Sequence, residues 1–492
     1  MTQSKPVDRD VLLLVCLATL KLLFHLCTNG QYGFHRDELA TLDDARHLAW
    51  GYVAYPPLTP FLGRIALELF GASLTGFRFL AALAQSVAMV VTGLMARRLG
   101  GGRVAMVVAA IAAMLAPISL SASSLFQYVS FDFLWFVLLA YFVIRLIDSN
   151  DPRWWVAIGA ALGLGALTKY AVAFYVAGLV VGVFVTPLRA HLRSKWLWIG
   201  AALSIAIALP NLMWELRHDF ITLDFLKFIH ARDVRIGRTG SFWIDQFKVS
   251  TNLFALPLWV FGLYVLFTAR GRRYRILGWM AVVPVILFAL AKGRGYYTGP
   301  LYPMLLAAGA AHLQLRRIGW AVIALLLLAG TIVVPIVLPL VPIHSRYWDF
   351  VNDRNGDLRE EIGWPELARE VARIWTTLDP AERAEAGIYC GNYGEAGAIN
   401  LYGPAYGLPP VISGINSYWL RGPGTPSPKT LVVVGSKRED VEKACAMVEL
   451  VGHITNSAGV LNEETERHPD IFICRKLRQP IEKMWPKLRS FG

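Results

Sequence analysis

Long uncharged blocks of apolar residues, separated by short polar segments, fill most of the first 340 positions of the chain. Most blocks are long enough to cross a hydrocarbon core about 30 Å thick as a helix. The pattern predicts about eleven transmembrane helices, at residues 11–28, 75–97, 103–120, 126–147, 154–168, 170–187, 196–213, 252–269, 276–291, 299–314 and 319–340.

Basic residues are shared unevenly between the short loops that join these blocks. The loops on one side hold fourteen Lys and Arg residues, and those on the other hold Lys169, Lys292 and Arg294. Because basic residues accumulate in cytoplasmic loops, the N-terminus is predicted to be cytoplasmic and the C-terminus extracytoplasmic. The fourteen are Arg97, Arg98, Arg103, Arg145, Arg153, Arg189, Arg193, Lys195, Arg270, Arg272, Arg273, Arg275, Arg316 and Arg317.

Two longer segments interrupt the apolar blocks on the predicted outer side. Residues 29–74 show the pattern of two amphipathic helices, Asp37–Trp50 and Leu58–Phe70, separated by the stiff Tyr55-Pro56-Pro57 turn. Residues 214–250 mix aromatic and charged residues, which is typical of a segment at the membrane interface. Both segments are predicted to lie on the outer face of the membrane.

The pattern changes near residue 341 to that of a soluble domain. Trp364-Pro365 opens a predicted helix, and short apolar runs at Gly387–Cys390, Thr430–Val434 and Ile471–Cys474 predict strands that alternate with helices such as Glu439–Leu450. The chain therefore divides into a transmembrane domain at 1–340 and an exported α/β domain at 341–492. The five cysteines show no spacing typical of a disulfide framework or of a zinc site.

Composition supports a polytopic α-helical membrane protein. Hydrophobic residues make up 55% of the chain and charged residues 17%, against about a quarter charged in soluble domains. The net charge of +13 arises mostly in the short loops, so it reflects the orientation of the chain in the membrane. No nucleic-acid partner is expected. The chain has neither a Rossmann glycine fingerprint nor a Walker loop, so no nucleotide site is predicted.

The densest polar cluster directly follows the first block, at His35-Arg36-Asp37-Glu38. At the outer end of a helix bundle, the Asp37-Glu38 pair could act as general base for a hydroxyl nucleophile, with Arg36 balancing its charge. The alternative is that both carboxylates only stabilise the N-terminus of the following helix. Asp132, near the outer end of the fourth block, is a second catalytic candidate, because an ionisable group at such depth is costly. The alternative for Asp132 is a structural ion pair with Arg78.

The cations on the predicted outer side are candidates for binding a phosphate at the membrane surface. Lys169-Tyr170 lies between two blocks, and Lys292, Arg294, Tyr296 and Tyr297 share a glycine-rich segment. Positive charge beside tyrosine hydroxyls suits a phosphate group. The alternative is that these side chains only snorkel from helix ends to the membrane surface.

Several short motifs are spread along the chain: Phe34-His-Arg-Asp-Glu-Leu, Gly51-Tyr-Val-Ala-Tyr-Pro-Pro-Leu, Leu69-Phe-Gly71, Gly76-Phe-Arg78, Leu167-Thr-Lys169-Tyr170, the segment from Lys292 to Pro303 and Asn392-Tyr-Gly-Glu-Ala-Gly-Ala-Ile399. Together they resemble the motifs of the bacterial glycosyltransferases related to protein O-mannosyltransferases and to the lipid A aminoarabinose transferase, a group of the glycosyltransferase family 39 type. The resemblance covers most of the chain.

The resemblance implies a C-type glycosyltransferase fold and a polyprenyl-phosphate sugar as donor. By position, Asp37 matches the family's catalytic base, Asp132 the aspartate at the outer end of the fourth span, and Lys292 the basic residue before the Tyr-Tyr-Pro segment. The aminoarabinose transferases carry Glu-Lys before the double proline, where this chain has Ala54-Tyr55. This departure argues against that donor's mode of binding.

We therefore expect an inverting glycosyltransferase of the cell inner membrane that modifies lipopolysaccharide or another part of the envelope on its extracytoplasmic face. The expected partners are a polyprenyl-phosphate sugar, a glycan, lipid or protein acceptor, and membrane lipids. No cofactor is expected, although a divalent metal is left open. The alternatives are a flippase of lipid-linked sugars and a membrane scaffold that presents the 341–492 domain. The candidate catalytic residues are Asp37, Glu38 and Asp132, and the candidate substrate-binding residues are His35, Arg36, Tyr55, Lys169, Tyr170, Lys292, Arg294, Tyr296 and Tyr297.

Overall fold

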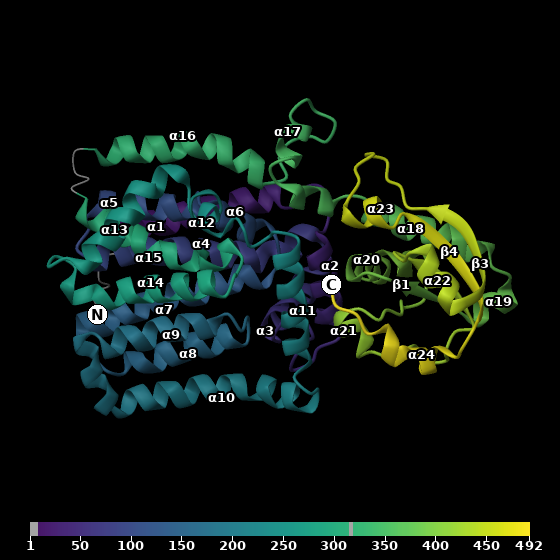
Figure 1. Cartoon of the computed structure of the whole chain (residues 1–492). Coiled ribbons are helices and arrows are strands. Elements are labelled where there is room, and N and C mark those ends of the chain that lie inside the picture. The colour runs from purple at the N-terminus through teal and green to yellow at the C-terminus, as the bar shows by residue number, and fades with distance from the viewer. Residues whose placement is uncertain (1–7, 314–317) are drawn as a thin grey trace, which may run out of the picture.

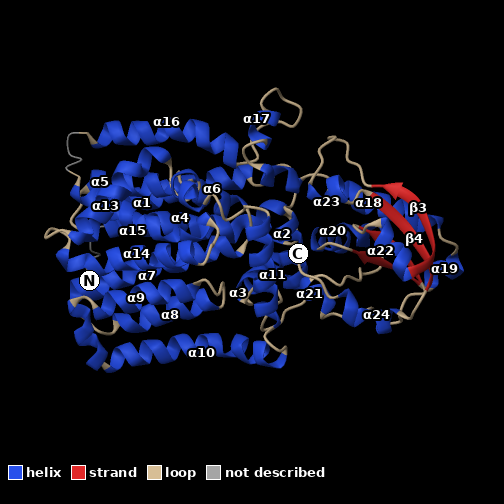
Figure 2. Ribbon diagram, in the orientation of Figure 1, coloured by secondary structure: helices blue, strands red, loops and turns tan. Residues whose placement is uncertain are grey.

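The computed structural model describes residues 8–313 and 318–492, which form a helical bundle and a smaller domain that contains a β-sheet at one end of the bundle (Figure 1). Arg316 and Arg317, which the charge pattern assigns to an inner loop, lie outside the described residues. Strands occur only in the smaller domain, as far as the chain is described (Figure 2).

Among residues 8–313 and 318–492, six helices are long and apolar enough to cross a membrane. They are α1 (Arg9–Thr28), α4 (Leu74–Arg98), α7 (Tyr128–Ser149), α10 (Lys195–Arg217), α14 (Arg275–Leu290) together with the short 3-10 turn η3 (Arg272–Tyr274) before it, and α16 (Gly319–Val337).

Three bent pairs of helices raise the number of candidate spans in the described residues to nine. The first pair bends by 63° at Pro117, which cannot continue the preceding helix, and the others bend by 100° and 88°. The pairs are α5 (Arg103–Met114) with α6 (Pro117–Ser124), α9 (Val172–Phe184) with η1 (Pro187–Arg193), and α12 (Phe242–Lys248) with η2 (Leu253–Ala255) and α13 (Leu256–Phe267).

The predicted count of about eleven spans is therefore not confirmed. The predicted spans 154–168 and 299–314 correspond to α8 (Trp154–Ala166) and α15 (Tyr302–His312), with 13 and 11 residues. At about 1.5 Å per residue these helices are about 20 Å long or less, which is shorter than the hydrocarbon core. Leu167 and Thr168 follow α8 as a turn, and residues 299–301 of the second predicted span belong to the 3-10 helix η4 (Gly295–Leu301), so hydropathy alone overestimated the length of each helix.

Several short helices lie at the end of the bundle that meets the sheet domain. The two predicted amphipathic helices appear as α2 (Arg36–Arg46), which ends four residues earlier than expected, and α3 (Leu58–Phe70). The predicted interfacial segment forms α11 (Ile221–Arg235) and α12. α2, α3 and α11 lie between the bundle and the sheet domain in Figure 1, whereas α12 lies beside α6.

The loops rich in arginine meet at the opposite end of the bundle. Arg97 pairs with Asp8 at a distance of 2.5 Å, and Arg103 pairs with Asp10 at 2.5 Å, so the start of α1 lies beside the loop between α4 and α5. Arg273 similarly reaches the carbonyl of Ile147 at the end of α7. The predicted inner loops are thus clustered, while the side of the membrane on which they lie stays a prediction.

The smaller domain contains a four-stranded sheet with strand order β1-β2-β4-β3. The strands are β1 (Ala386–Cys390), β2 (Thr430–Val434), β3 (Cys445–His453) and β4 (Asp470–Leu477). β1 and β2 are parallel, with Ile388 opposite Val432, and the other two pairs are antiparallel. The remaining elements are η4 (Gly295–Leu301), α17 (Trp348–Asn352), η5 (Gly356–Glu361), α18 (Trp364–Thr377), α19 (Pro380–Ala384), α20 (Tyr393–Tyr402), η6 (Gly403–Tyr406), α21 (Asn416–Trp419), α22 (Arg438–Ala444), α23 (Glu463–Arg467) and α24 (Ile481–Leu488).

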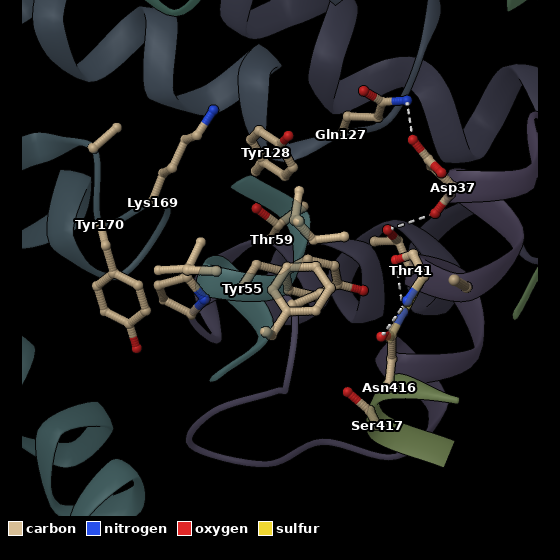
Figure 3. Close-up of a pocket in the computed structure, with 18 of the residues that line it drawn as sticks. Asp37, Thr41, Tyr55, Thr59, Gln127, Tyr128, Lys169, Tyr170, Asn416 and Ser417 are labelled. Carbon is tan, nitrogen blue, oxygen red and sulfur yellow. Dashed lines mark hydrogen bonds between the residues drawn. The ribbon is translucent and has the colours of Figure 1, made fainter. Parts of the chain in front are cut away.

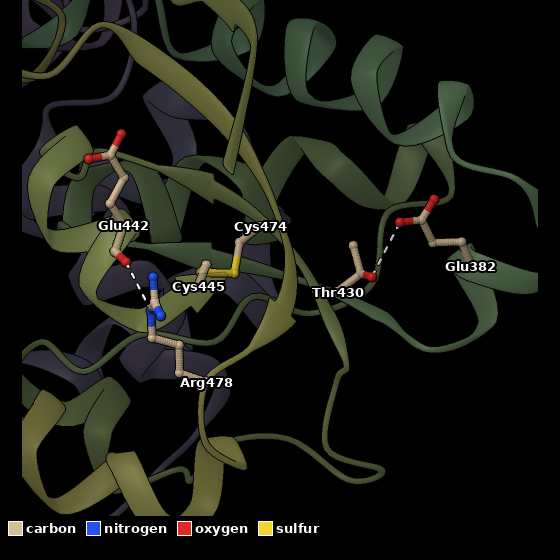
Figure 4. The surroundings of a disulfide bond; sticks show 6 residues. All are labelled: Glu382, Thr430, Glu442, Cys445, Cys474 and Arg478. Atoms are coloured by element: carbon tan, nitrogen blue, oxygen red, sulfur yellow. Dashed lines mark hydrogen bonds between the residues drawn. A yellow bond between two sulfur atoms is a disulfide. The ribbon is translucent and has the colours of Figure 1, made fainter. Parts of the chain in front are cut away.

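Two sequence-based expectations for this domain were wrong. The run 439–450 was expected to be helical throughout, but α22 ends at Ala444 and the chain continues as the edge strand β3, which pairs with β4. This pairing brings Cys445 close to Cys474, and the two form a disulfide (Figure 4). Their separation of 29 residues carries no local signal, because only the strand pairing places them together.

One hydrophobic core continues from the sheet into the end of the bundle. It contains Val432 of β2, Trp364 of α18 and Ile399 of α20, and it extends through Leu39 of α2 to Phe77 of α4. α20 crosses α2 closely, because Gly397 leaves room for the backbone of Leu39, which would lie 2.7 Å from an added Cβ. The sheet domain is therefore packed directly on α2, the helix that carries Asp37 in its first turn.

Candidate active site

A cavity of about 350 Å³ opens where the bundle, α2, α11 and the sheet domain meet. Asp37 and Lys169 lie on opposite sides of this cavity, with Tyr55 and Tyr128 between them (Figure 3). Its polar and charged side chains are Asp37, Thr41, Asp44, Tyr55, Thr59, Gln127, Tyr128, Lys169, Tyr170, Arg232, Arg294, Tyr297, Tyr393, Asn416, Ser417 and Tyr418.

Asp37 stands in the first turn of α2, and 45% of its side chain is exposed. The hydroxyl of Tyr393, at the start of α20, donates a hydrogen bond to Oδ1 at 2.9 Å. The amide of Gln127 donates to Oδ2 at 3.3 Å. Asp37 is therefore held by groups from both parts of the chain while it still faces the cavity.

The surroundings of Asp37 favour the ionised carboxylate. Burial raises its pKa, but the charges of His35, Arg36 and Arg294 and the hydrogen bond from Tyr393 outweigh this effect and lower the pKa below its ordinary value. Burial and the charge of Asp37 raise the pKa of Tyr393, so this side chain keeps its proton and donates it in the hydrogen bond. Asp37 is therefore available as a proton acceptor.

Glu38, the neighbouring candidate, is directed away from the cavity and into the protein. Its side chain is fully buried and is bound by Arg78, whose Nε lies 2.9 Å from Oε1 and whose Nη2 lies 2.6 Å from Oε2. It also accepts hydrogen bonds from the backbone N–H of His35 and of Phe126, at 2.9 and 2.7 Å. Arg78 therefore pairs with Glu38 and not with Asp132, the partner that the alternative interpretation of Asp132 gave it, and Glu38 fixes the start of α2.

His35 and Arg36 also hold α2 in place rather than lining the cavity. The Nδ1 atom of His35 accepts a hydrogen bond from the backbone N–H of Asp37 at 3.1 Å and caps the helix. Arg36 contacts Glu463 and lies 3.4 Å from Glu464, and both glutamates belong to α23. The predicted contact of Arg36 with phosphate thus competes with an ion-pair cluster that joins α2 to the sheet domain.

Tyr55 lines the cavity as expected and donates a hydrogen bond to Oδ2 of Asp44 at 2.6 Å. Arg421 of the sheet domain pairs with the other oxygen of Asp44 at 2.6 Å and also contacts Asp43. Burial raises the pKa of Asp44 to about 6, against the opposing effects of Arg421 and Tyr55. This carboxylate is therefore already engaged by a cation of the protein.

Lys169, in the loop between α8 and α9, lies in a cage of tyrosine rings. Its ammonium is 3.5 Å from the ring centre of Tyr297, 4.4 Å from that of Tyr128 and 5.5 Å from that of Tyr296. Cations are attracted to the faces of such rings. The neighbouring Tyr170 also lines the cavity and donates hydrogen bonds to Asn211 and Glu215 of α10 at 2.7 and 3.0 Å.

Arg294 lines the cavity, whereas Lys292 does not appear among the lining residues that the structure describes. Arg294 forms two hydrogen bonds with Asp233 of α11, at 2.6 and 2.9 Å, and its Nη1 lies 3.4 Å from the hydroxyl of Tyr296. Lys292 is exposed and lies in a turn with φ of 48°. The phosphate contact expected from Lys292 stays a prediction, while Lys169 and Arg294 are the expected phosphate-binding cations that line the cavity.

Asp132 does not reach the cavity either. It lies within α7, is 6% exposed, and its Oδ1 has no hydrogen-bond partner among the described residues. In the ranges 8–313 and 318–492, no group of three or more His, Cys, Asp or Glu is arranged to hold a metal ion. Independence from metal stays a prediction.

Sequence reasoning missed several residues that line the cavity. Gln127 follows α6, Arg232 lies in the interfacial segment, and Asn416–Tyr418 form the start of α21. Arg232 belonged to a segment whose composition indicated the membrane interface, but nothing local indicated which of its charges faces inward. Residues 416–418 carried no motif, because only the docking of the sheet domain brings them to the site.

Comparisons with known proteins agree with the motifs. Residues 54–214 match the family described as dolichyl-phosphate-mannose-protein mannosyltransferase. The chain is 28% identical over 358 residues to the lipid A galacturonosyltransferase RgtD of Rhizobium johnstonii, a match that covers 68% of this chain and 72% of that protein.

Solved structures show the same fold. The ArnT structures from Cupriavidus metallidurans, in the apo state and bound to undecaprenyl phosphate, are both 16% identical, with TM-scores of 0.55 and 0.57, and each match covers 94% of this chain and 97% of that one. An oligosaccharyltransferase from Archaeoglobus fulgidus is 13% identical with a TM-score of 0.50, covering 86% of this chain and 68% of that one. The resemblance to membrane glycosyltransferases is therefore confirmed, and the chain has their C-type fold.

Proposed function

We propose that this chain, which carries a domain of the mannosyltransferase type at residues 54–214, transfers a sugar from a polyprenyl-phosphate donor to a glycolipid of the cell envelope. One observation carries the proposal. An ionised carboxylate, Asp37, faces a cavity whose other side presents the cations Lys169 and Arg294. A base and a phosphate-binding group on either side of one space are what this transfer requires.

The reaction is a displacement at the anomeric carbon. Asp37 removes the proton from the acceptor hydroxyl, whose oxygen forms a bond to that carbon while the bond to the phosphate oxygen breaks. The electron pair of the broken bond leaves with the prenyl phosphate, and the configuration of the sugar is inverted. Tyr393 and Gln127 orient the carboxylate through their hydrogen bonds to its two oxygens.

Lys169 and Arg294 neutralise the leaving phosphate in this scheme. The departing group gains a negative charge, and preorganised cations stabilise that charge in the transition state. The undecaprenyl phosphate bound in one structural neighbour supports a lipid phosphate in a fold of this kind. The scheme uses no metal or cofactor, so a chelator should leave turnover unchanged.

The location of the site is proposed to be extracytoplasmic. The site lies at the end of the bundle opposite the arginine-rich loops, beside a domain that contains the Cys445–Cys474 disulfide. Disulfides persist in oxidising compartments, and basic loops stay in the cytoplasm. Both observations favour the outer face of the inner membrane.

A lipid acceptor is favoured by the apolar side of the cavity and by one relative. Phe225, Leu226 and Ile229 of α11 line the cavity next to its polar residues. A 28% identical relative is named a lipid A galacturonosyltransferase. We therefore propose lipid A or a similar glycolipid as the acceptor.

Purified protein incubated with undecaprenyl-phosphate sugars and lipid A tests the proposal. The expected result is the release of undecaprenyl phosphate together with a lipid A of greater mass. Movement of intact donor across vesicle membranes, with no cleavage by protein that is folded and supplied with lipid A, would instead identify a flippase. Asp224→Asn, at an exposed position of α11, is a matched control for substitutions of Asp37.

A further inference from the structure

The side chains that line the cavity leave an excess of positive charge. Three cations, Lys169, Arg232 and Arg294, face two carboxylates, Asp37 and Asp44. Asp44 is paired with Arg421 and Arg294 with Asp233, and neither of these partners lines the cavity. Lys169 and Arg232 are therefore left with Asp37 as the remaining carboxylate among the described lining side chains, and Asp37 is reserved as the base.

Arg232 has one distant ion pair, whereas Arg294 has two short hydrogen bonds and Lys169 is surrounded by tyrosine rings. The Nη2 atom of Arg232 lies 3.8 Å from Asp233, whose carboxylate already forms two shorter hydrogen bonds with Arg294. Its Nε is buried and has no hydrogen-bond partner within the described part of the chain. Burial and the nearby charge of Arg238 lower its pKa although Asp233 opposes them, which agrees with an incompletely balanced guanidinium.

A guanidinium with unused donors in a substrate cavity is suited to a planar anion. Arginine binds carboxylates through two parallel hydrogen bonds, and leaving such donors unpaired when buried is costly. A donor sugar that carries its own carboxylate would supply this partner. A sugar with an ammonium group would meet Arg232 and Arg294 as like charges, since Asp44 is already occupied.

We propose that the sugar transferred is a uronic acid and that Arg232 binds its carboxylate. This inference rests on the proposed transfer from a polyprenyl-phosphate donor. It assigns the two anions of the donor to different cations, with the phosphate at Lys169 and Arg294 and the sugar carboxylate at Arg232. The name of the 28% identical relative, a galacturonosyltransferase, supports the same class of sugar.

Two donors that differ at one carbon test the assignment. Undecaprenyl-phosphate galacturonic acid and undecaprenyl-phosphate galactose differ only in a carboxylate or a CH₂OH at C6. With lipid A as acceptor, the wild-type protein should show a kcat/KM about 10- to 100-fold higher for the uronic-acid donor, the range expected for a charge-assisted hydrogen bond. Arg232→Gln should reduce this preference to near unity. Arg232→Lys, which keeps the positive charge but loses the two parallel N–H donors of the guanidinium, should give an intermediate preference.

The control and the contrary outcomes separate the two proposals. Arg235→Gln changes an exposed arginine on the same helix and should keep the wild-type preference. If Arg232→Gln lowers kcat/KM equally for both donors, Arg232 binds the phosphate and the assignment is wrong. If the wild-type protein in a mixture of donors uses galactose or an amino sugar as well as galacturonic acid, the inference fails while the proposed transfer stands. Because this competition uses the wild-type protein, it tests the preference for a uronic acid even if Arg232→Gln does not fold. If no donor releases undecaprenyl phosphate, the proposed function itself fails.

Discussion

Two adjacent carboxylates at the start of α2 have different surroundings because a helix turns by about 100° per residue. Asp37 faces the cavity and accepts hydrogen bonds from Tyr393 and Gln127, whereas Glu38 is fully buried against Arg78. From the sequence, both carboxylates were candidates for the base, and the alternative was that both only stabilise the start of the helix. The structure shows which side chain occupies which position, and the role of Asp37 as base is the proposal that follows.

Asp37→Asn should lower turnover by about 10² or more, because the amide keeps the size of the side chain but cannot accept the proton. Binding of undecaprenyl phosphate should survive, since Lys169 and Arg294 are untouched. Single-turnover release of undecaprenyl phosphate at saturating donor measures the effect, with Asp224→Asn as the control. Near wild-type turnover in Asp37→Asn would show that another group is the base.

The pH dependence of kcat/KM distinguishes Asp37 from Asp44, the other carboxylate in the cavity. The pKa of Asp37 lies below its ordinary value of 3.8, so this base stays ionised as the pH falls from 7 to 5 and should impose no acidic limb there. Burial raises the pKa of Asp44 to about 6. A one-proton loss of activity as the pH falls through about 6 would therefore identify Asp44, and a flat profile supports Asp37.

Some residues that line the cavity could be picked out from the sequence because they depart from a local rule. Lys169 and Arg294 were noticed because the orientation rule excludes cations from outer loops, and both line the cavity. The same rule could not separate Arg294 from Lys292, although Arg294 lines the cavity and Lys292 is not among its lining residues. Arg232 and Tyr418 were not foreseen, because their position depends on the packing of segments far apart in the chain.

At the scale of elements, the attachment of α2 depends on one buried arginine. Arg78 of α4 is fully buried and contacts Glu38 of α2 and Glu361 of η5, the latter at 3.2 Å. It also donates hydrogen bonds to the backbone carbonyls of Asn29 and Gly33 at 3.0 and 2.9 Å. A single guanidinium thus connects three segments beneath the site.

Arg78→Met should destabilise the protein by about 3 to 5 kcal/mol, because it leaves two buried carboxylates without their cation. Thermal unfolding of the detergent-solubilised protein measures the loss as a lower midpoint temperature. Arg103→Met is the matched control, since Arg103 is 61% exposed and its ion pair with Asp10 lies at the surface. Equal midpoint temperatures for the two variants would show that Arg78 does not stabilise the packing of α2 and η5 on α4.

Element-level predictions failed where long-range pairing overrode a local pattern. Val441, Cys445 and Val448 repeat at intervals of four and three, which suits a helix, yet the chain from Cys445 onward pairs with β4 as a strand. Helix ends were misjudged in the bundle for a related reason, since apolar residues such as Leu167 and Val185 also follow the ends of α8 and α9. Hydropathy reports burial or lipid contact and does not report where a helix stops.

At the scale of the whole molecule, the charge pattern and the disulfide lead to one orientation. The arginine-rich loops lie at the end of the bundle opposite the sheet domain. Alkaline phosphatase, which is active only after export, should be active when fused at Ser345 and inactive when fused at His191. Treatment of intact cells with a thiol reagent should leave Cys445 and Cys474 unlabelled until a reductant is added. Activity at His191 together with none at Ser345 would reverse the orientation.

The cavity is lined by two parts of the chain that are far apart in sequence. The Asp37–Tyr393 and Asp44–Arg421 contacts join residues that are 356 and 377 positions apart. The cations proposed to hold the donor belong to the bundle side, whereas Asn416, Ser417 and Tyr418 belong to the sheet domain. Changes in the sheet domain can therefore alter which acceptor is admitted while Lys169 and Arg294 stay in place. Under the proposed function, this division would allow the acceptor to change through the sheet domain without a change in the lipid-linked donor bound by the bundle.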